Sequence, residues 1–129
     1  MKILSGTYKG IRIETTKNAS YRPTKSRVRK SIFDILTPFH YLNILDLYSG
    51  SGILGFESAS RGAASVTFVE NNFKNIKLLK HNKLKFNDTD FSVIKNNVET
   101  FLKRSEKKFD LIFADPPYGK IDYEWLFNS

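Results

Sequence analysis

Residues 43–55 have the sequence Asn-Ile-Leu-Asp-Leu-Tyr-Ser-Gly-Ser-Gly-Ile-Leu-Gly, an apolar run followed by closely spaced glycines. The run is typical of a buried strand, and the glycines predict a tight loop that leads into a helix. Glu70 lies at the predicted end of the next strand. This combination predicts a site for an adenosine-type cofactor. Glycines allow close backbone approach, and an acid at the second strand tip can accept hydrogen bonds from both ribose hydroxyls.

Asp46, inside this strand, distinguishes between two cofactors that such a loop could bind, NAD and S-adenosylmethionine. A carboxylate suits the sulfonium and ammonium groups of S-adenosylmethionine, whereas it would repel the pyrophosphate of NAD. The alternative is that Asp46 only caps the loop or the following helix. On charge, the sequence favours S-adenosylmethionine.

Strand-like and helix-like segments alternate through the rest of the chain. The predicted strands are 43–47, 65–70, 91–95 and 109–114, and the predicted helices are 53–61, 71–86 and 98–104. Continuous apolar strands that alternate with amphipathic helices indicate an α/β fold, in which helices cover both faces of a parallel sheet. Ligands bind at the carboxyl ends of the strands in such sheets, where the glycine loop and Glu70 are expected.

The N-terminal part has a different pattern. Residues 2–4 and 11–15 predict a small β-hairpin, and a helix capped by Thr24 is expected to end near Pro38. The apolar side of this helix is expected to carry Val28, Ile32, Ile35 and Leu36. We therefore expect an N-terminal extension over residues 1–40 and a Rossmann-like domain over residues 41–129.

Positive charge is concentrated in this extension. The 129-residue chain has a net charge of +8, and residues 1–40 carry nine Lys and Arg against two acidic residues. A nucleic-acid backbone is the natural partner, because each cation that neutralises a phosphate releases counterions. A solvated basic face is the alternative. The candidate phosphate-binding residues are Arg22, Lys25, Arg27, Arg29 and Lys30. A second lysine run, at residues 74–83, is expected to solvate the outer face of an amphipathic helix.

Asp115-Pro116-Pro117-Tyr118 follows the last predicted strand and is the most specific motif of the chain. The exocyclic amine of a nucleobase is a poor nucleophile, because its lone pair is delocalised into the ring. Asp115 and the Pro116 carbonyl could each accept an N–H of that amine, the prolines would stiffen the loop, and Tyr118 could stack on the base. A rigid turn is the alternative. We interpret these four residues as candidate catalytic residues for methyl transfer to an amine.

Composition excludes several other classes of site. The chain has no cysteine, which rules out a disulfide framework, a thiolate metal site and a cysteine nucleophile, and its two histidines do not suggest a metal site. No apolar run has the length of a membrane span, and the start lacks the apolar core of a secretory signal. These features predict a cytoplasmic protein without a metal or a membrane partner.

Together, the motifs resemble the RsmD family, the guanine-N2 methyltransferases of 16S ribosomal RNA, over essentially the whole chain. The resembling segments are Ile3-Leu4-Ser5-Gly6, Lys9-Gly10, Arg22-Pro23-Thr24, Arg27-Val28-Arg29, residues 32–36, residues 46–52, Leu54-Gly55, Glu57, Ser60-Arg61-Gly62, Val69-Glu70 and residues 115–118. The resemblance implies S-adenosylmethionine as the methyl donor and a guanine of 16S ribosomal RNA, free or in the small ribosomal subunit, as the substrate.

The same resemblance implies roles for individual residues. Cofactor contacts are expected from Asp46, Ser49, Gly50, Gly52 and Glu70, and an adenine contact from Asn97. Arg22, Thr24 and Arg27 are expected near the site and the RNA backbone, together with the other basic residues of that segment.

Two features depart from the family pattern. Lys30 stands where the family commonly has Glu, which adds a positive charge near the expected RNA face. The resemblance implies a sheet of seven strands in the order 3-2-1-4-5-7-6. This chain stops shortly after the fourth predicted strand, so the last three strands are expected to be missing. The fourth strand would then be an apolar edge through which chains could associate.

Two alternative functions stay open. Asp-Pro-Pro-Tyr is shared by adenine-N6 methyltransferases of DNA, so that chemistry is the first alternative. The second is a truncated, catalytically inactive remnant that binds only RNA or cofactor.

Overall fold

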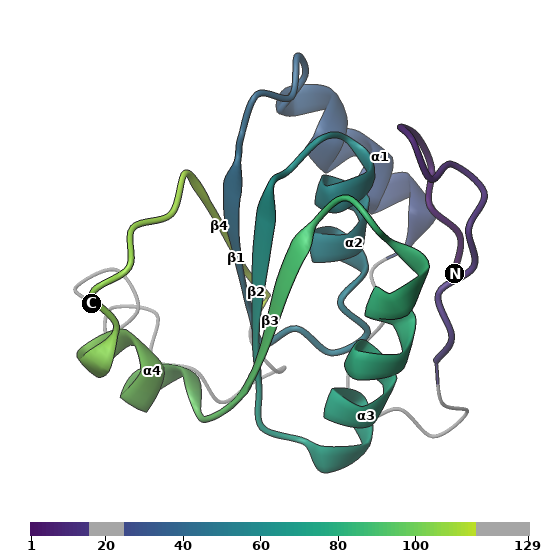
Figure 1. The fold of residues 1–129 in the computed structure, drawn as a ribbon. Helices are drawn as coiled ribbons and strands as arrows, with labels where there is room; N and C mark the ends of the chain where they lie inside the picture. Colours follow the sequence, from purple (N-terminus) through teal and green to yellow (C-terminus); the bar gives the residue numbers. More distant parts are fainter. Residues whose placement is uncertain (16–24, 116–129) are drawn as a thin grey trace.

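The computed structural model describes residues 1–15 and 25–115. Its centre is a four-stranded sheet in the order β3-β2-β1-β4, formed by β1 (Asn43–Leu47), β2 (Ser65–Glu70), β3 (Asp90–Lys95) and β4 (Leu111–Ala114). Each strand is parallel to its neighbours. The strand order and direction confirm the predicted α/β architecture (Figure 1).

The position of β1 in the middle of the sheet determines where a ligand can bind. Leu47 pairs with Val69 of β2 and with Ala114 of β4, so the three strands end side by side. The segments that follow β1, β2 and β4 therefore leave the sheet at the same end, where the carboxyl ends of the strands lie. The strand order reverses at β1, and this is the place where open parallel sheets bind ligands.

Helices cover both faces of the sheet (Figure 1). The helices α1 (Ser26–Ile35), α2 (Ile53–Ser60) and α3 (Phe73–Asn82) lie on one face, and α4 (Val98–Arg104) lies on the other. A short 3-10 turn, η1 (Lys83–Lys85), follows α3. This placement follows from the buried strands, because β1 and β2 present apolar side chains to both sides.

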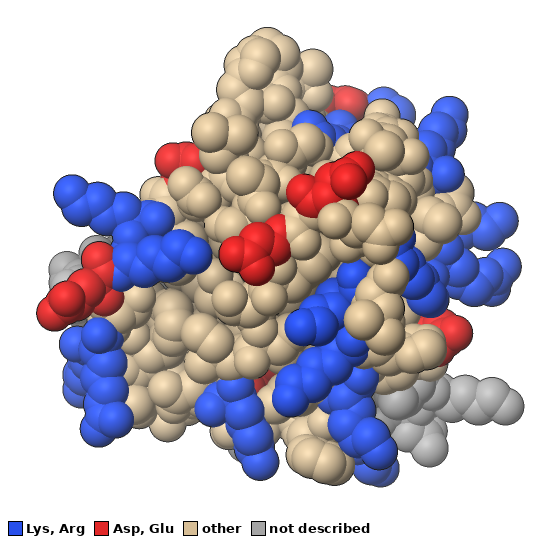
Figure 2. Space-filling model, viewed as in Figure 1, with Lys and Arg blue, Asp and Glu red and all other residues tan. Residues whose placement is uncertain are grey.

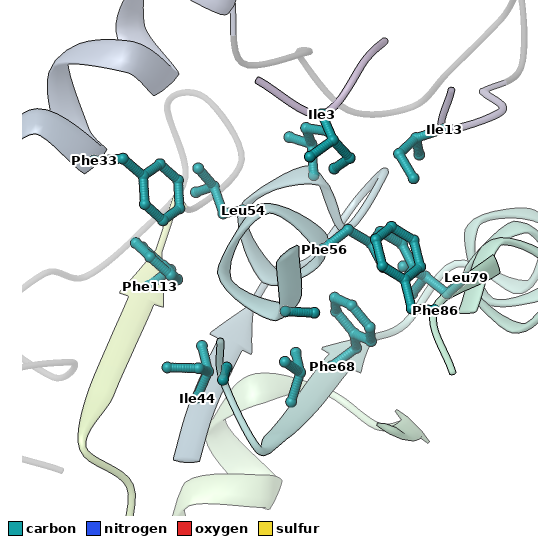
Figure 3. Packing of buried hydrophobic residues seen from close by; sticks show 14 residues of the cluster. Ile3, Ile13, Phe33, Ile44, Leu54, Phe56, Phe68, Leu79, Phe86 and Phe113 are labelled. Carbon is teal, nitrogen blue, oxygen red and sulfur yellow. The ribbon is translucent and has the colours of Figure 1, made fainter. Parts of the chain in front are cut away.

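The larger apolar cluster lies between the sheet and the helices α1, α2 and α3 (Figure 3). The ring of Phe56 in α2 lies 4.9 Å from that of Phe68 in β2 and 5.0 Å from that of Phe86. Phe33 of α1 lies 5.8 Å from Phe113 of β4, which fixes α1 beside this strand. The smaller cluster, under α4, contains Leu45, Leu47, Val69, Val98 and Phe101.

The N-terminal hairpin is present with fewer strand contacts than the sequence predicts. It has one antiparallel bridge, between Lys2 and Arg12, and the Ile3 N–H donates to the Ile11 carbonyl over 2.9 Å. Ile3 and Ile13 are buried in the larger cluster. The hairpin and the sheet therefore share one core.

The buried face of α1 differs from the predicted one. Val28 and Ile35 are 48% and 83% exposed, whereas Arg29 and Phe33 are buried. The predicted apolar side is wrong at those two positions. Arg29 and Phe33, one turn apart, form the side of α1 that packs against the protein, and the buried carboxylate of Glu57 in α2 lies beside Arg29. Thr24, the predicted cap, lies outside the described residues.

Within the part of the chain that the structure describes, β4 is paired on one side only, with β1. Ile112 in this strand is 52% exposed. Association of chains through this edge stays a prediction. In the same described ranges, no helix has the length and apolar character needed to cross a bilayer.

Candidate active site

The loop between β1 and α2 has a backbone that depends on its glycines. The φ angle is 55° at Gly50 and 78° at Gly52, in the left-handed region that glycine adopts without strain. Tyr48, at the tip of β1, also has a φ of 55°, which is uncommon for a residue with a side chain. The loop thus turns sharply from the strand into the first residue of α2.

Packing explains two of these glycines. A Cβ at Gly52 would lie 2.4 Å from Leu79 Cδ2, and a Cβ at Gly55 would lie 2.4 Å from Phe68 Cε1. Gly55 therefore allows α2 to pack closely against β2, which is the role of the last glycine in loops of this type. The cofactor contact of Gly52 stays a prediction. Packing against Leu79 already explains why this residue has no side chain.

Glu70 joins the tip of β2 to the glycine loop. Its Oε1 accepts the Gly50 N–H over 2.9 Å, and its Oε2 accepts the Asn72 N–H over 2.8 Å and an Asn75 Nδ2–H over 3.2 Å. The structure therefore brings Gly50 and Glu70 together, as their spacing predicts.

Asn72 and Asn75 support Glu70 and were missed from the sequence. Asn72 is also the N-cap of α3, since its side chain accepts the Asn75 N–H over 3.1 Å. The signal that could have identified them is Asn-x-x-Asn directly after a strand, where asparagine is a favoured helix cap.

Ser49 is buried and bonded within its own loop. Its hydroxyl donates to the Asp46 carbonyl over 2.5 Å, and its N–H donates to the Val69 carbonyl over 3.2 Å. These contacts hold the loop against β2. A contact between Ser49 and a cofactor stays a prediction.

Asp46 lies at the centre of the site and is buried. Its Oδ2 accepts the Gly55 N–H in the first turn of α2 over 3.2 Å. Burial raises the pKa of Asp46 well above its usual value. The charges of Glu70 and Asp115 raise it further, while the Gly55 N–H opposes the shift. The observed contact is the one expected of a capping acid, and a cofactor contact by Asp46 stays a prediction.

The remaining site residues follow β3 and β4. Asn97 caps α4, where its side chain accepts the Thr100 N–H over 2.7 Å, and its adenine contact is untested. Asp115 is exposed directly after β4, next to the end of β1. Its charge acts on Asp46, which places both carboxyl groups in one region. Pro116, Pro117 and Tyr118 lie outside the described residues.

The site therefore combines a glycine loop, an acid tied to that loop, and a second acid on the neighbouring strand end. Among the described residues, no three side chains of the kinds that bind metals come together. A family model described as conserved hypothetical protein 95 matches residues 1–128. The chain belongs to this family, the RsmD family.

Relatives in the RsmD family carry informative names. A protein of Buchnera aphidicola named ribosomal RNA small subunit methyltransferase D is 38% identical over 141 residues, which cover 100% of this chain and 72% of the relative. A Haemophilus influenzae protein of the same name is 36% identical over 123 residues, which cover 92% of this chain and 64% of the relative. The chain thus spans about two thirds of the length of these curated relatives.

The solved structure of yhhF from Escherichia coli matches this chain with a TM-score of 0.87 and 29% identity. The match covers 99% of this chain and 70% of that structure. The RsmD-family chain thus has the Rossmann-like methyltransferase fold that the sequence predicts.

The basic residues assigned to RNA differ in their surroundings. Lys25, Arg27 and Lys30 are exposed at or in α1, and Lys30 pairs with Asp34 over 2.8 Å. Their exposure makes them accessible to a phosphate backbone, and that contact stays a prediction. Arg22 and Thr24 lie outside the described residues.

Arg29 is buried, which contradicts its predicted role in binding RNA. It is 2% exposed, and it donates from Nη1 to the Lys2 carbonyl over 3.0 Å and from Nη2 to the Ser26 hydroxyl over 3.1 Å. Its Nη1 also lies 3.9 Å from Glu57 Oε1 in α2. Arg29 therefore joins the hairpin, α1 and α2 inside the protein.

Proposed function

We propose that the protein transfers a methyl group from S-adenosylmethionine to the exocyclic N2 of a guanine in 16S ribosomal RNA. The observation that carries the proposal is the register of β1, which ends beside both β2 and β4. The glycine loop with Glu70 and the Asp115 carboxylate consequently share one edge of the sheet. The names of the relatives support small-subunit ribosomal RNA as the substrate.

The residues around Gly50 fit the cofactor. A carboxylate offers roughly four acceptor positions, and Glu70 accepts three hydrogen bonds from the described residues. It is partly exposed, so it can accept a ribose hydroxyl without leaving the loop. S-adenosylmethionine supplies an electrophilic methyl group on a sulfonium when it is bound. Gly50 and Glu70 would hold its adenosine part, at the same end of the sheet as the end of β4.

Asp115 would act on the amine that receives the methyl group. Its carboxylate can accept an N–H of the guanine amine and orient the nitrogen lone pair toward the methyl carbon. The nitrogen would gain the methyl group that the sulfonium gives up, and it would lose one proton to Asp115 or to water. The Pro116 carbonyl and the Tyr118 ring complete this assignment from the sequence, as a second acceptor and a surface for base stacking.

Binding of S-adenosylhomocysteine, measured by titration calorimetry on the 129-residue chain, tests the cofactor half of the proposal. Glu70→Ala should weaken binding about 10-fold or more, because hydrogen bonds to a charged group contribute ~1.5–3 kcal/mol. Asp34→Ala, which removes an exposed acid of α1 paired with Lys30, is the control and should change little. Equal losses in the two variants, or no binding by the unaltered chain, would contradict the assignment.

Methyl incorporation from tritium-labelled S-adenosylmethionine tests the substrate. The acceptors are naked 16S RNA, assembled small subunits and duplex DNA. The proposal expects labelled N2-methylguanosine after nuclease digestion of the RNA. N6-methyladenine in the DNA would support the adenine-N6 alternative. Cofactor binding without transfer to any acceptor would support the inactive remnant.

A further inference from the structure

A lysine-rich surface on α3 and the end of β3 has no part in the reaction as proposed. Its exposed residues are Phe73, Lys74, Lys77, Lys80 and Lys95, and we call it the α3 lysine face. Figure 2 shows Lys and Arg side chains gathered over α3. The sequence alone assigns the lysines of residues 74–83 to solvation of a helix, and the structure adds observations that solvation does not explain.

The charges of α3 are not balanced along the helix. Residues 71–86 contain five lysines and no Asp or Glu, so no acid within this segment offsets the repulsion between its lysines. Lys74 occupies the first turn, where the helix dipole disfavours a cation. The nearby acid, Glu14, lies against His81 and Lys85 instead. Among the described residues, the α3 lysines thus face solvent without a carboxylate.

An aromatic ring stands among these lysines. Phe73 is 62% exposed, and the Nζ atoms of Lys77 and Lys95 lie 5.8 and 5.6 Å from its ring centroid. The two lysines come from different elements, α3 and β3, and converge on one exposed ring. Aromatic rings flanked by cations are the arrangement by which proteins stack unpaired bases and neutralise the adjoining phosphates.

The α3 lysine face begins beside the candidate active site. Lys95 pairs in register with Glu70, and Phe73 starts the helix that directly follows Glu70. From there α3 extends away from the site over 10 residues, which is about 15 Å at ~1.5 Å per residue. An RNA strand bound along the helix would therefore reach the carboxyl ends of β2 and β3. These ends are separated by β1 from the end of β4, where the base is proposed to lie.

We infer that the α3 lysine face binds a single-stranded segment of the RNA substrate that passes the Glu70 side of the candidate active site. Phe73 stacks on an unpaired base, and Lys74, Lys77, Lys80 and Lys95 neutralise phosphates. This inference rests on the proposed function, which supplies RNA as the substrate. A protein partner fits less well, because charged residues are depleted at the centre of protein interfaces and lysine is depleted there overall.

The test measures binding of a fluorescein-labelled single-stranded RNA to the 129-residue chain by fluorescence anisotropy at several salt concentrations. The triple variant Lys74→Gln, Lys77→Gln, Lys80→Gln should bind about 10-fold more weakly at low salt. Its slope of log affinity against log salt should shrink by about 2, at ~0.7 per lost phosphate contact. The control Arg104→Gln, Lys107→Gln, Lys108→Gln removes the same charge at and after α4, on the opposite face, and should lose less than about 3-fold.

Phe73→Leu separates stacking from charge. It should weaken binding of single-stranded RNA about 10-fold and leave binding of duplex RNA unchanged, because the bases of a duplex are already stacked. Equal losses in the two triple variants would mean that only net charge matters. Equal losses of single-stranded and duplex RNA in Phe73→Leu would mean that the ring does not stack. Either result overturns the inference.

Calorimetry with S-adenosylhomocysteine on the same variants distinguishes this inference from the proposed function. Each variant should bind the cofactor product as the unaltered chain does, which also shows that it is folded. If the variants bind the cofactor product normally and the α3 substitutions do not weaken RNA binding, the inference alone is overturned. RNA binding that depends on α3, in a chain that neither binds cofactor nor methylates RNA, would overturn the proposed function alone.

Discussion

Glu57 in α2 and Arg29 in α1 face each other inside the protein, with 3.9 Å between Glu57 Oε1 and Arg29 Nη1. Glu57 is fully buried and also accepts the N–H groups of Leu4 and Ser5 over 2.9 and 3.1 Å. Its Oε2 lies 3.0 Å from Arg61 Nε. One carboxylate thus connects the hairpin, α1 and α2.

We expect Glu57→Ala to lower the free energy of unfolding by about 3–5 kcal/mol, because it leaves Arg29 buried without a carboxylate. Urea denaturation followed by circular dichroism measures the change. Glu57→Gln should lose less, since the amide oxygen can still accept an N–H. The control is Glu99→Ala, which breaks an exposed pair with Lys103 and should cost less than about 1 kcal/mol. Similar losses at the two glutamates would show that the buried network does not stabilise the fold.

Gly55→Ala should also destabilise the protein, although alanine is normally the better helix residue by up to ~1 kcal/mol. The added Cβ would lie 2.4 Å from Phe68 Cε1, and Phe68 is fully buried and cannot move aside freely. We expect a loss of about 1–3 kcal/mol, as for other overpacked cores. In a double-mutant cycle, Phe68→Leu should relieve part of this loss. Strictly additive losses would locate the cause elsewhere.

Much of this fold was predictable because it depends on local patterns. The apolar run at 43–47 gave the central strand, and the glycine loop gave the turn into α2, since both are properties of neighbouring residues. The link between Gly50 and Glu70 was predictable as well, because parallel neighbouring strands end at the same edge. The position of the site at the strand ends can therefore be predicted from the spacing of Gly50 and Glu70 in the sequence.

Burial of charged residues was not predictable from the same patterns. The sequence places Arg29 among the candidate phosphate-binding residues because it belongs to a cluster of basic residues. Its partner Glu57 lies far along the chain, and the periodicity of α1 contains no information about it. For the same reason the sequence places Val28 and Ile35 on the apolar side of the helix although both are exposed, because local hydrophobicity does not show which face a distant element covers.

Asp46 should make stability depend on pH. An aspartate in the unfolded chain titrates near 3.8, and burial raises the pKa of Asp46 well above this value in the folded chain. Between the two values only the folded state holds the proton, so the free energy of unfolding falls as pH rises, by at most about 1.4 kcal/mol per pH unit. Asp46→Asn cannot ionise. Its stability relative to the unaltered chain should therefore increase with pH across this window.

Urea denaturation at a series of pH values measures this dependence. Asp110→Asn provides a control of opposite sign, because the Asn43 and Leu42 N–H groups lower the pKa of Asp110. The stabilisation by Asp110 is present above pH 3.8 and is lost as pH falls through its lowered pKa. A difference between Asp46→Asn and the unaltered chain that stays constant with pH would mean that Asp46 titrates normally.

Asp115→Asn should separate catalysis from cofactor binding. The amide has the shape of the carboxylate, but it is a weaker hydrogen-bond acceptor and cannot take the proton that the amine loses. We expect methyl transfer to fall about 100-fold or more, in the range for a lost acid–base group, while S-adenosylhomocysteine binding changes little. Asp110→Asn makes the same chemical change just before β4, at the opposite edge of the sheet, where Asp110 accepts the Leu42 and Asn43 N–H groups. It should leave transfer unchanged. Full activity of Asp115→Asn would show that the carboxylate does not orient the amine, and the methyl acceptor would then have to be positioned by groups other than the end of β4.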